Sequence, residues 1–348
     1  MTNLISTRLL AQQLISPQFS EPESLVGWFG AMQAQEYKLF RLAVAMRLKK
    51  PSVAKVDEAL ADGRLVRLHL NRTTWQVVSG ADVRWMLGLH RERIYRSITS
   101  FARSNGLSVD ETTIRQSHRL MKEVLSGRHL DRDSLYEMHR AAGINVTKHQ
   151  LVYCLSLAEA DGLVCNGPVE GRSATYALLD DRVPPQPEIS TDEKLKRLAR
   201  QYFQSHGAAT LDDFVWWAGL PKSLCRQGME ALGDALVGEQ CHGETYYRMQ
   251  TARHRGFRRG RHILLPSYDE YLIGYRSRHL VVPEAYAHKV DNHFGIFYPV
   301  ILRDGIVVGN WKGDVRQGVH RVQQSYFDPA DRPVPDLEIC YRSIAPDL

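Results

Sequence analysis

Two glutamines separated by one residue, Gln33 and Gln35, close an apolar segment that has the periodicity of a helix. A glutamine amide both accepts and donates hydrogen bonds and does not titrate, so a pair of them could orient a water molecule without acting as an acid. Residues two apart on a continuous helix point about 200° from each other, so both can face one site only if the helix ends there. For the tripeptide alone, two surface amides are the more common interpretation.

A second candidate group is the acid pair Asp269 and Glu270, which lies in the apolar stretch Leu264–Ile273. Alternation along that stretch would turn one of the two carboxylates inward, where it needs a partner or a chemical role. Asp269 could supply electrostatic support or act as a base toward water. Alternatively, it forms a structural ion pair with an arginine such as Arg276 or Arg278.

Five arginines fall within the nine residues 253–261, with no acidic residue among them. Such a cluster is typical of a phosphate-backbone contact, although a solvated basic loop has the same composition. The net charge of +6 and the pI near 9.0 agree with a polyanionic partner. The candidate contacts are Arg253, Arg255, Arg258, Arg259 and Arg261, with Arg84, Arg91, Arg93 and Arg96 as a second, looser basic helix face.

The sequence contains no recognisable cofactor or metal motif. Its glycines never form GxGxxG, its histidines never form HExxH, and its five cysteines include no CxxC pair. We therefore expect chemistry without a cofactor or a metal, and cysteines that are buried thiols. No apolar run approaches the roughly 20 residues that a membrane span requires, and the N-terminus lacks the features of a signal peptide. This predicts a soluble, cytoplasmic protein.

One pattern of predicted elements recurs three times: short amphipathic helices, a glycine followed by Leu and Val, and then strand, turn and strand. This order is typical of a winged helix, and we expect such units in residues 1–104, 105–182 and 188–250. Short strands and turns predict a small β domain in residues 251–348, either a barrel or a curled sheet. The expected fold class is α+β, mainly helical, with tandem winged-helix units and a C-terminal β domain.

Some local signals define individual elements. Apolar spacing predicts helices over Pro22–Met32 and Val53–Ala61, and a long connecting helix within Ser79–Arg103. Toward the C-terminus, the turn Arg303-Asp304-Gly305 predicts a hairpin that follows a strand over Phe294–Leu302.

Taken together and in this order, several segments resemble the AlkZ-like family of winged-helix DNA glycosylases. In that family the first winged unit carries Gln-x-Gln or Gln-x-Asp, and Gln33-Ala34-Gln35 matches the Gln-x-Gln branch. The likeness covers nearly the whole chain. It includes the segments Trp75–Leu87, Gly162–Pro168, Asp212–Leu220, Leu264–Tyr275 and Val308–Lys312.

The resemblance implies a monofunctional DNA glycosylase that hydrolyses N-glycosidic bonds of cationic N7-alkylated purines, with interstrand cross-links as a further substrate. Such a purine already carries a positive charge, so bond cleavage expels a neutral base and leaves an oxocarbenium-like sugar. Gln33 and Gln35 suit this chemistry because it needs an oriented water and a negative dipole more than an acid. The implied partner is alkylated or cross-linked double-stranded DNA, at the nucleoid. No dimerisation helix is evident, and we expect a monomer.

The chain departs from the family at Arg72-Thr73-Thr74-Trp75-Gln76. The family commonly has Gly or Pro where Thr73 stands, and His where Gln76 stands. Gln76 can hydrogen-bond a phosphate but cannot become a cation, while Arg72 either contacts phosphate or lies in solvent. This departure gives weight to an alternative function, a non-catalytic winged-helix DNA-binding protein or transcriptional regulator.

Overall fold

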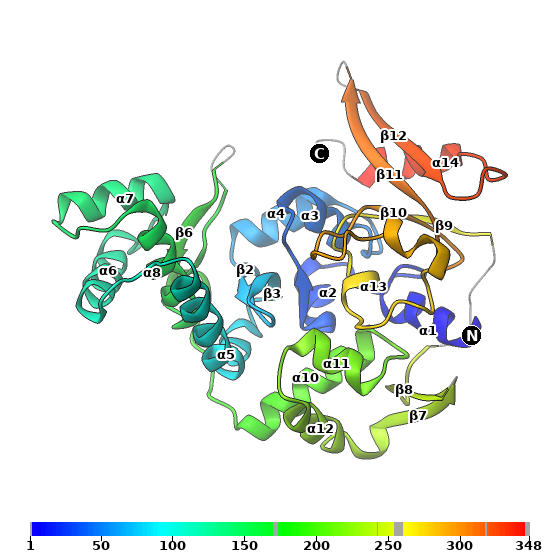
Figure 1. The fold of residues 1–348 in the computed structure, drawn as a ribbon, viewed down its shortest axis with the longest axis horizontal. Coiled ribbons are helices and arrows are strands. Elements are labelled where there is room, and N and C mark those ends of the chain that lie inside the picture. Colours follow the sequence, from blue (N-terminus) through cyan, green and yellow to red (C-terminus); the bar gives the residue numbers. More distant parts are fainter. Residues whose placement is uncertain (1, 170–172, 242, 254–259, 317–318, 345–348) are drawn as a thin grey trace. The chain divides into compact units, whose positions relative to one another are not determined.

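The computed structural model describes residues 2–169, 173–241, 243–253, 260–316 and 319–344. The chain forms two compact units (Figure 1). The first combines residues 1–57 with residues 195–348, and the second is formed by residues 58–194. The boundaries fall within the helices α4 (Val53–Ala61) and α10 (Thr191–Ser205). From the sequence we expected four domains that follow one another along the chain. That expectation did not include a unit built from both ends of the chain.

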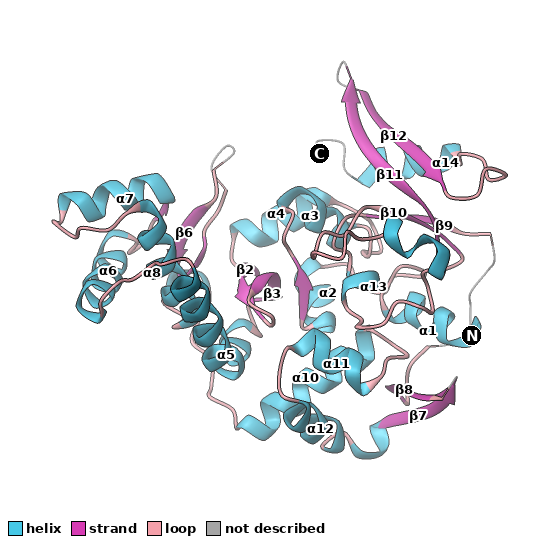
Figure 2. Ribbon diagram, in the orientation of Figure 1, coloured by secondary structure: helices cyan, strands magenta, loops and turns pink. Residues whose placement is uncertain are grey.

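The first unit mixes helices with short antiparallel strands (Figure 2). Its other helices are α1 (Thr2–Ala11), α2 (Pro22–Phe29), α3 (Tyr37–Ala45), α11 (Leu211–Ala218), α12 (Lys222–Glu230), α13 (Glu270–Ile273) and α14 (Pro335–Ile344), with 3-10 turns at Gly233–Ala235 and Glu284–Lys289. Its strands are β1 (Ala31–Gln33), β7 (Leu236–Cys241), β8 (Glu244–Met249), β9 (His262–Leu265), β10 (Val300–Arg303), β11 (Ile306–Arg316) and β12 (Val319–Tyr326).

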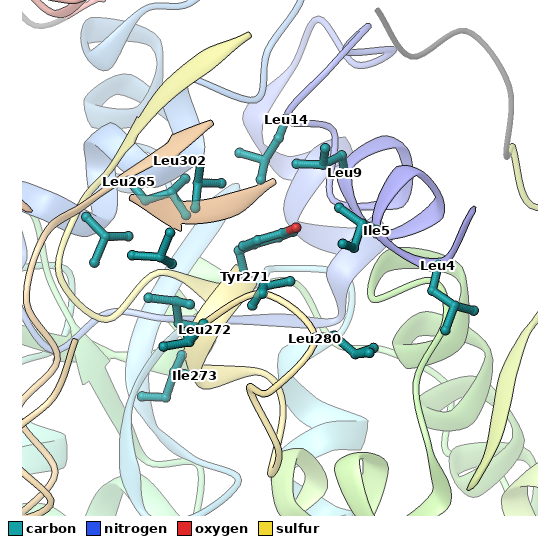
Figure 3. Packing of buried hydrophobic residues seen from close by; sticks show 14 of the residues in the cluster. Leu4, Ile5, Leu9, Leu14, Leu265, Tyr271, Leu272, Ile273, Leu280 and Leu302 are labelled. Carbon is teal, nitrogen blue, oxygen red and sulfur yellow. The ribbon is translucent and has the colours of Figure 1, made fainter. Parts of the chain in front are cut away.

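Apolar side chains from both ends of the chain build the core of this unit. Leu9 and its neighbours on α1 pack with Leu265 of β9 and Leu302 of β10 (Figure 3). Tyr271 of α13 lies in the same cluster, and its hydroxyl donates a 3.0 Å hydrogen bond to the carbonyl of Gly305, so its one polar group is satisfied. This shared core explains why residues far apart in sequence form one unit.

The C-terminal strands form an open four-stranded sheet in the order β12-β11-β10-β9. No closed barrel is present in the described residues, so that alternative was wrong. The edge strands β12 and β9 do not pair with each other, so the sheet is open. Helix α14 packs against both of these strands. The predicted hairpin turn is confirmed, since Arg303 pairs with Ile306 and the turn residue Gly305 has a φ of 84°.

The strand predicted over residues 294–302 is shorter than expected and begins at Val300. His293 and Gly295 have φ values of 61° and 95°, which no strand accommodates. The Asn292 side-chain oxygen instead accepts hydrogen bonds from the backbone N–H groups of Phe294 (2.9 Å) and Ile296 (3.0 Å). These residues therefore form a tight loop before the strand.

The second unit contains the hairpin β2 (Leu65–Leu70) and β3 (Thr74–Ser79) followed by the long helix α5 (Val83–Ser104). The remaining elements are α6 (Glu111–Val124), β4 (His129–Asp131), α7 (Arg132–Ala141), α8 (Lys148–Ala160), β5 (Val164–Asn166), β6 (Thr175–Leu178) and α9 (Leu179–Arg182). Strands β4, β6 and β5 form an antiparallel sheet in that order. The observed class is α+β with several small antiparallel sheets, and the assignment of winged-helix units stays a prediction.

Candidate active site

The Gln-x-Gln motif lies in the link between α2 and α3, not at the end of a helix, and its first glutamine ends the strand β1. Helix α2 ends at Phe29, and Gly30 then adopts a φ of 80°. L side chains rarely adopt this φ, so glycine is favoured here, and a Cβ atom would also lie 2.8 Å from Oε1 of Gln201. The expected helix over residues 22–32 therefore ends three residues early. Because β1 ends at Gln33 and Gln35 lies in a bend, the 200° separation that a continuous helix would impose does not apply.

The two glutamines differ in exposure. Gln33, the last residue of β1, is only 6% exposed, and Ala34 is fully buried. Gln35 lies in a bend and is exposed. Of the two glutamines, Gln35 is therefore the one open to solvent, whereas Gln33 is enclosed by the protein.

The backbone of the motif is held by Glu270, the first residue of α13. The N–H of Gln33 donates a 2.6 Å hydrogen bond to Oε1 of Glu270. The second carboxylate oxygen lies 3.2 Å from Nε2 of His206. Glu270 is 3% exposed and His206 is fully buried. Sequence reasoning missed this pair: Glu270 was noted only as an acid in an apolar stretch, and His206 has no local signal.

His206 sits in an aromatic environment that disfavours its charged form. Its ring stacks on Tyr202 at 4.4 Å and meets the edges of Trp217 and Phe29 at 5.5 and 5.8 Å. Burial lowers the pKa of His206, an effect that the hydrogen bond to Glu270 opposes. The pair thus provides a dry and rigid support for Gln33.

Asp269 forms a buried ion pair with Arg47. Its Oδ2 and Oδ1 accept hydrogen bonds of 2.8 and 2.7 Å from Nη1 and Nη2 of Arg47, and both side chains have no solvent exposure. Oδ1 also accepts from the backbone N–H of Tyr271 at 2.9 Å, which caps α13. Both carboxylate oxygens are therefore occupied by structural contacts.

The expected structural ion pair between Asp269 and an arginine is confirmed, but the arginine is Arg47 and neither of the two examples expected from the sequence. Arg276 pairs with Asp212 at 3.1 Å, and Arg278 donates to the carbonyl of Leu272 at 3.0 Å. The expectation that only one of the two acids turns inward was wrong. Asp269 and Glu270 are both buried, although strand alternation would turn only one inward. The reason is local geometry, since these residues start a short helix and do not extend a strand.

Arg72 and Gln76 belong to the β2–β3 hairpin of the second unit. Arg72 is half-buried and occupies the middle of the turn between Asn71 and Thr73, whose φ values are 46° and 61°. Gln76 is only 2% exposed, and its Nε2 donates a 2.9 Å hydrogen bond to Oγ1 of Thr74. Its amide thus supports the hairpin from inside, and contact with phosphate would require the side chain to turn outward.

The basic run is described only at its two ends. Arg253 is exposed, and its guanidinium donates a 3.2 Å hydrogen bond to the carbonyl of Ser16. The backbone N–H of Arg261 donates to Asp304 at 2.9 Å, while its side chain is exposed. The three central arginines, Arg255, Arg258 and Arg259, lie outside the described residues.

The second basic face, on α5, is reduced by ion pairs. Arg84 pairs with Asp180 at 2.8 Å, and Arg91 pairs with Asp161. The other two arginines, together with nearby serines, line a shallow cavity of about 580 Å³. Its lining residues are Arg93, Arg96, Ser97, Ser100, Phe101 and Ser104.

Within the described part of the chain, no three His, Cys, Asp or Glu side chains gather in a way that could hold a metal ion. No helix in the described ranges is long and apolar enough to cross a membrane. The cysteines are all free: Cys154, Cys165 and Cys225 are buried as expected, whereas Cys241 is half-buried and Cys340 is exposed.

Comparison with known proteins agrees with these features. The profile of the DNA glycosylase AlkZ-like family matches residues 26–335, so the chain belongs to this family of DNA glycosylases. An interstrand DNA cross-link repair glycosylase from Streptomyces sahachiroi is 27% identical over 328 residues, which covers 85% of this chain and 84% of that protein. The solved structure of the Streptomyces sahachiroi DNA glycosylase AlkZ superposes with a TM-score of 0.77 at 20% identity. That match covers 99% of this chain and 95% of AlkZ, and it shows the same fold.

Proposed function

We propose that this DNA glycosylase hydrolyses the N-glycosidic bond of cationic N7-alkylated purines in double-stranded DNA. The bond between C1′ and N9 breaks, and its electron pair neutralises the purine. A water oxygen then bonds to C1′, and the water releases its proton to solvent. The observation that carries this proposal is the Gln33–Gln35 segment, in which an exposed glutamine follows one whose backbone N–H is bonded to Glu270.

The two amides have different roles in this proposal. The exposed side-chain oxygen of Gln35 orients the attacking water and places a negative dipole beside the sugar as it becomes cationic. Gln33 fixes the position of the Gln33–Gln35 segment through its backbone, and its side chain contributes a second amide dipole. Acid catalysis is not required, because the leaving purine already carries the positive charge that protonation would supply.

Asp269 acts in this proposal through structure. Its ion pair with Arg47 fixes the start of α13, and Glu270 is the next residue along that helix. A carboxylate whose two oxygens accept three hydrogen bonds is poorly placed to activate water as well.

Duplex DNA binds mainly through its backbone in this proposal. The arginines of residues 253–261 supply the positive charge, and Arg72 adds a phosphate contact from the hairpin. The name of the Streptomyces sahachiroi relative supports interstrand cross-links as a second substrate. A base tethered to both strands cannot be flipped out in full, so such a substrate favours an open binding surface. We infer that the protein acts as a monomer on chromosomal DNA in the cytoplasm.

The test is single-turnover release of base from a duplex that contains N7-methylguanine, read as abasic sites. Gln35→Ala should lower the rate on the order of ten- to a thousandfold, and Gln33→Ala should also lower it, while DNA affinity changes little. Gln18→Ala, at another exposed glutamine of the first unit, is the matched control and should behave as wild type. A second duplex with an N7-linked cross-link tests unhooking.

Two results would contradict the proposal. Wild-type base release by the Gln33→Ala/Gln35→Ala double variant would remove the motif from catalysis. No release from either duplex by the wild-type protein, together with sequence-specific binding to paired half-sites, would favour a transcriptional regulator.

A further inference from the structure

A cavity of about 630 Å³ opens in the first unit next to the Gln-x-Gln motif. Its wall begins at Glu36, the residue that follows Gln35, and continues along the first turn of α3 through Lys38 and Leu39. Adjacent residues have Cα atoms about 3.8 Å apart. The cavity therefore begins at the residue that follows Gln35, whose amide we place at the reacting sugar.

The floor of the cavity is rigid. The indole nitrogen of Trp311 donates a 2.7 Å hydrogen bond to the carbonyl of Leu265, and its ring meets the edge of Tyr341 at 5.3 Å. Asn310 is held by hydrogen bonds of 3.1 Å to the carbonyls of Lys289 and Pro299. Because these side chains already have partners inside the protein, the cavity is preformed and does not need to be opened by a ligand.

The lining suits a flat apolar group with a polar edge. Trp311, Tyr341 and Leu39 supply an apolar floor and side, and Tyr298, which is 39% exposed, stands at the opening. Glu36 and Lys312 are exposed and give the rim charges of both signs. Stacking on aromatic side chains favours planar groups.

The size of the cavity bears on which lesion it serves. Its volume lies within the range of about 300–1,000 Å³ that is typical of small-molecule sites. A methyl group on N7 is about the size of one water molecule, whose share of liquid volume is about 30 Å³, and would leave most of the space unused. A substituent of aromatic-ring size would bury apolar surface against the floor.

We propose that this cavity receives the substituent carried on N7 of the damaged purine, and that the enzyme favours bulky, planar apolar adducts over methyl. This inference rests on the proposed glycosylase function and adds to it the substrate class. Tyr298 and Leu39 are the residues that determine this specificity, because they border the opening and are not used by the hydrogen bonds that hold the floor.

The test compares single-turnover base release from two duplexes, one with N7-methylguanine and one with N7-(2-hydroxy-2-phenylethyl)guanine. The measured quantity is the ratio of the phenyl-adduct rate to the methyl rate. Leu39→Trp fills the cavity and Tyr298→Ala removes one wall. Each should lower the ratio by about tenfold or more, because a lost apolar contact of this kind changes discrimination by about 10- to 200-fold. Phe294→Ala, at a 92% exposed aromatic outside the lining, is the control and should leave the ratio unchanged.

The outcomes separate the two proposals. Release of methylguanine but not of the phenyl adduct by wild type, or a ratio unchanged in both cavity variants, overturns the cavity assignment and leaves the glycosylase proposal standing. Release of neither base by wild type overturns the glycosylase proposal, and the cavity assignment falls with it. Methylguanine release also shows that each variant is folded.

Discussion

The backbone N–H of Gln33 and the carboxylate of Glu270 are joined by a 2.6 Å hydrogen bond across a sequence separation of 237 residues. The position of the Gln-x-Gln motif is thus set by a short helix from the other end of the chain. Both partners are buried, so water does not compete for this hydrogen bond. The predictions below begin with this contact.

Replacement of Glu270 should impair base release more than DNA binding. Glu270→Ala leaves the Gln33 N–H buried without its acceptor, which costs about 1–3 kcal/mol and frees the backbone of the motif. We expect a single-turnover rate at least about tenfold lower, by comparison with the loss of one electrostatic group, with a DNA Kd close to wild type. Glu270→Gln keeps an acceptor for Gln33 and should recover most of the rate. A wild-type rate in a folded Glu270→Ala protein would exclude the positioning role.

Removing one partner of the buried Arg47–Asp269 ion pair should destabilise the protein more than replacing both partners. Asp269→Ala leaves Arg47 as an uncompensated buried cation and should lower the free energy of unfolding by about 3–5 kcal/mol. The double variant Arg47→Met/Asp269→Leu should recover much of this loss in urea unfolding. The control is Asp133→Ala, which breaks an exposed 2.6 Å pair with Lys148 and should cost at most about 1 kcal/mol. Equal losses in the two single variants would argue against this account.

Thr73→Gly should stabilise the second unit. Thr73 has a φ of 61°, in the left-handed region that a β-branched side chain rarely adopts, and its buried hydroxyl makes no hydrogen bond. Glycine removes a strain of about 1–2 kcal/mol but has more entropy to lose in the unfolded chain, so we expect a net gain of about 0.5–1 kcal/mol. Differential scanning calorimetry should show a higher Tm. A lower Tm would mean that the threonine methyl group packs better than its backbone suggests.

Stability should fall in mild acid because of His139. Its Nδ1–H donates to the carbonyl of Leu135 at 2.7 Å, Nε2 lies 2.8 Å from the hydroxyl of Ser117, and burial lowers its pKa. In the unfolded chain, His139 has an ordinary histidine pKa near 6.5. Below this pH the unfolded chain therefore binds a proton at His139 more readily than the folded protein does. The free energy of unfolding therefore stays level above this pH and falls below it, by at most about 1.4 kcal/mol per pH unit for one group. His206 contributes with the same sign.

Urea unfolding between pH 8 and pH 5.5 measures this effect. In His139→Gln the slope below pH 6.5 should become shallower for the second unit. An unchanged slope would assign the acid sensitivity to other groups.

DNA binding should depend strongly on salt and weakly on sequence. If about six phosphates are contacted, the logarithm of the association constant should fall with log salt at a slope of about −5. Arg258→Ala/Arg259→Ala should weaken binding equally for all sequences and make this slope shallower by nearly two. Arg84→Ala is the control, because Arg84 is paired with Asp180. An unchanged slope in the double variant would remove this run from the interface.

Elements with strong local signals could be predicted from the sequence. The helix predicted over Val53–Ala61 coincides with α4, and the predicted connecting helix corresponds to α5. The turn at Asp304-Gly305 was also correct, because two adjacent residues with positive φ define a hairpin locally. In each case the residues that determine the structure are neighbours in the chain.

The support of the candidate site could not be predicted, because it depends on contacts between distant segments. Nothing near Gln33 indicates that Glu270 accepts its backbone N–H, and nothing near Asp269 indicates Arg47, since both partners come from elsewhere in the chain. The early end of α2 was also missed, because the apolar spacing continues past Gly30, although the positive φ of this glycine ends the helix. Periodicity identifies which residues are buried but not which buried residues meet.

The division of the first unit between the two ends of the chain has a consequence for biosynthesis. A ribosome makes the Gln-x-Gln motif early and then residues 58–194, which can form their own core while the rest is still being translated. Glu270 and Asp269 emerge much later, and the first 57 residues have no completed core until then. A nascent chain that ends before Asp269 would therefore be able to fold residues 58–194 but not to cut a glycosidic bond, and catalytic competence would arise only after the segment that carries Glu270 has been made.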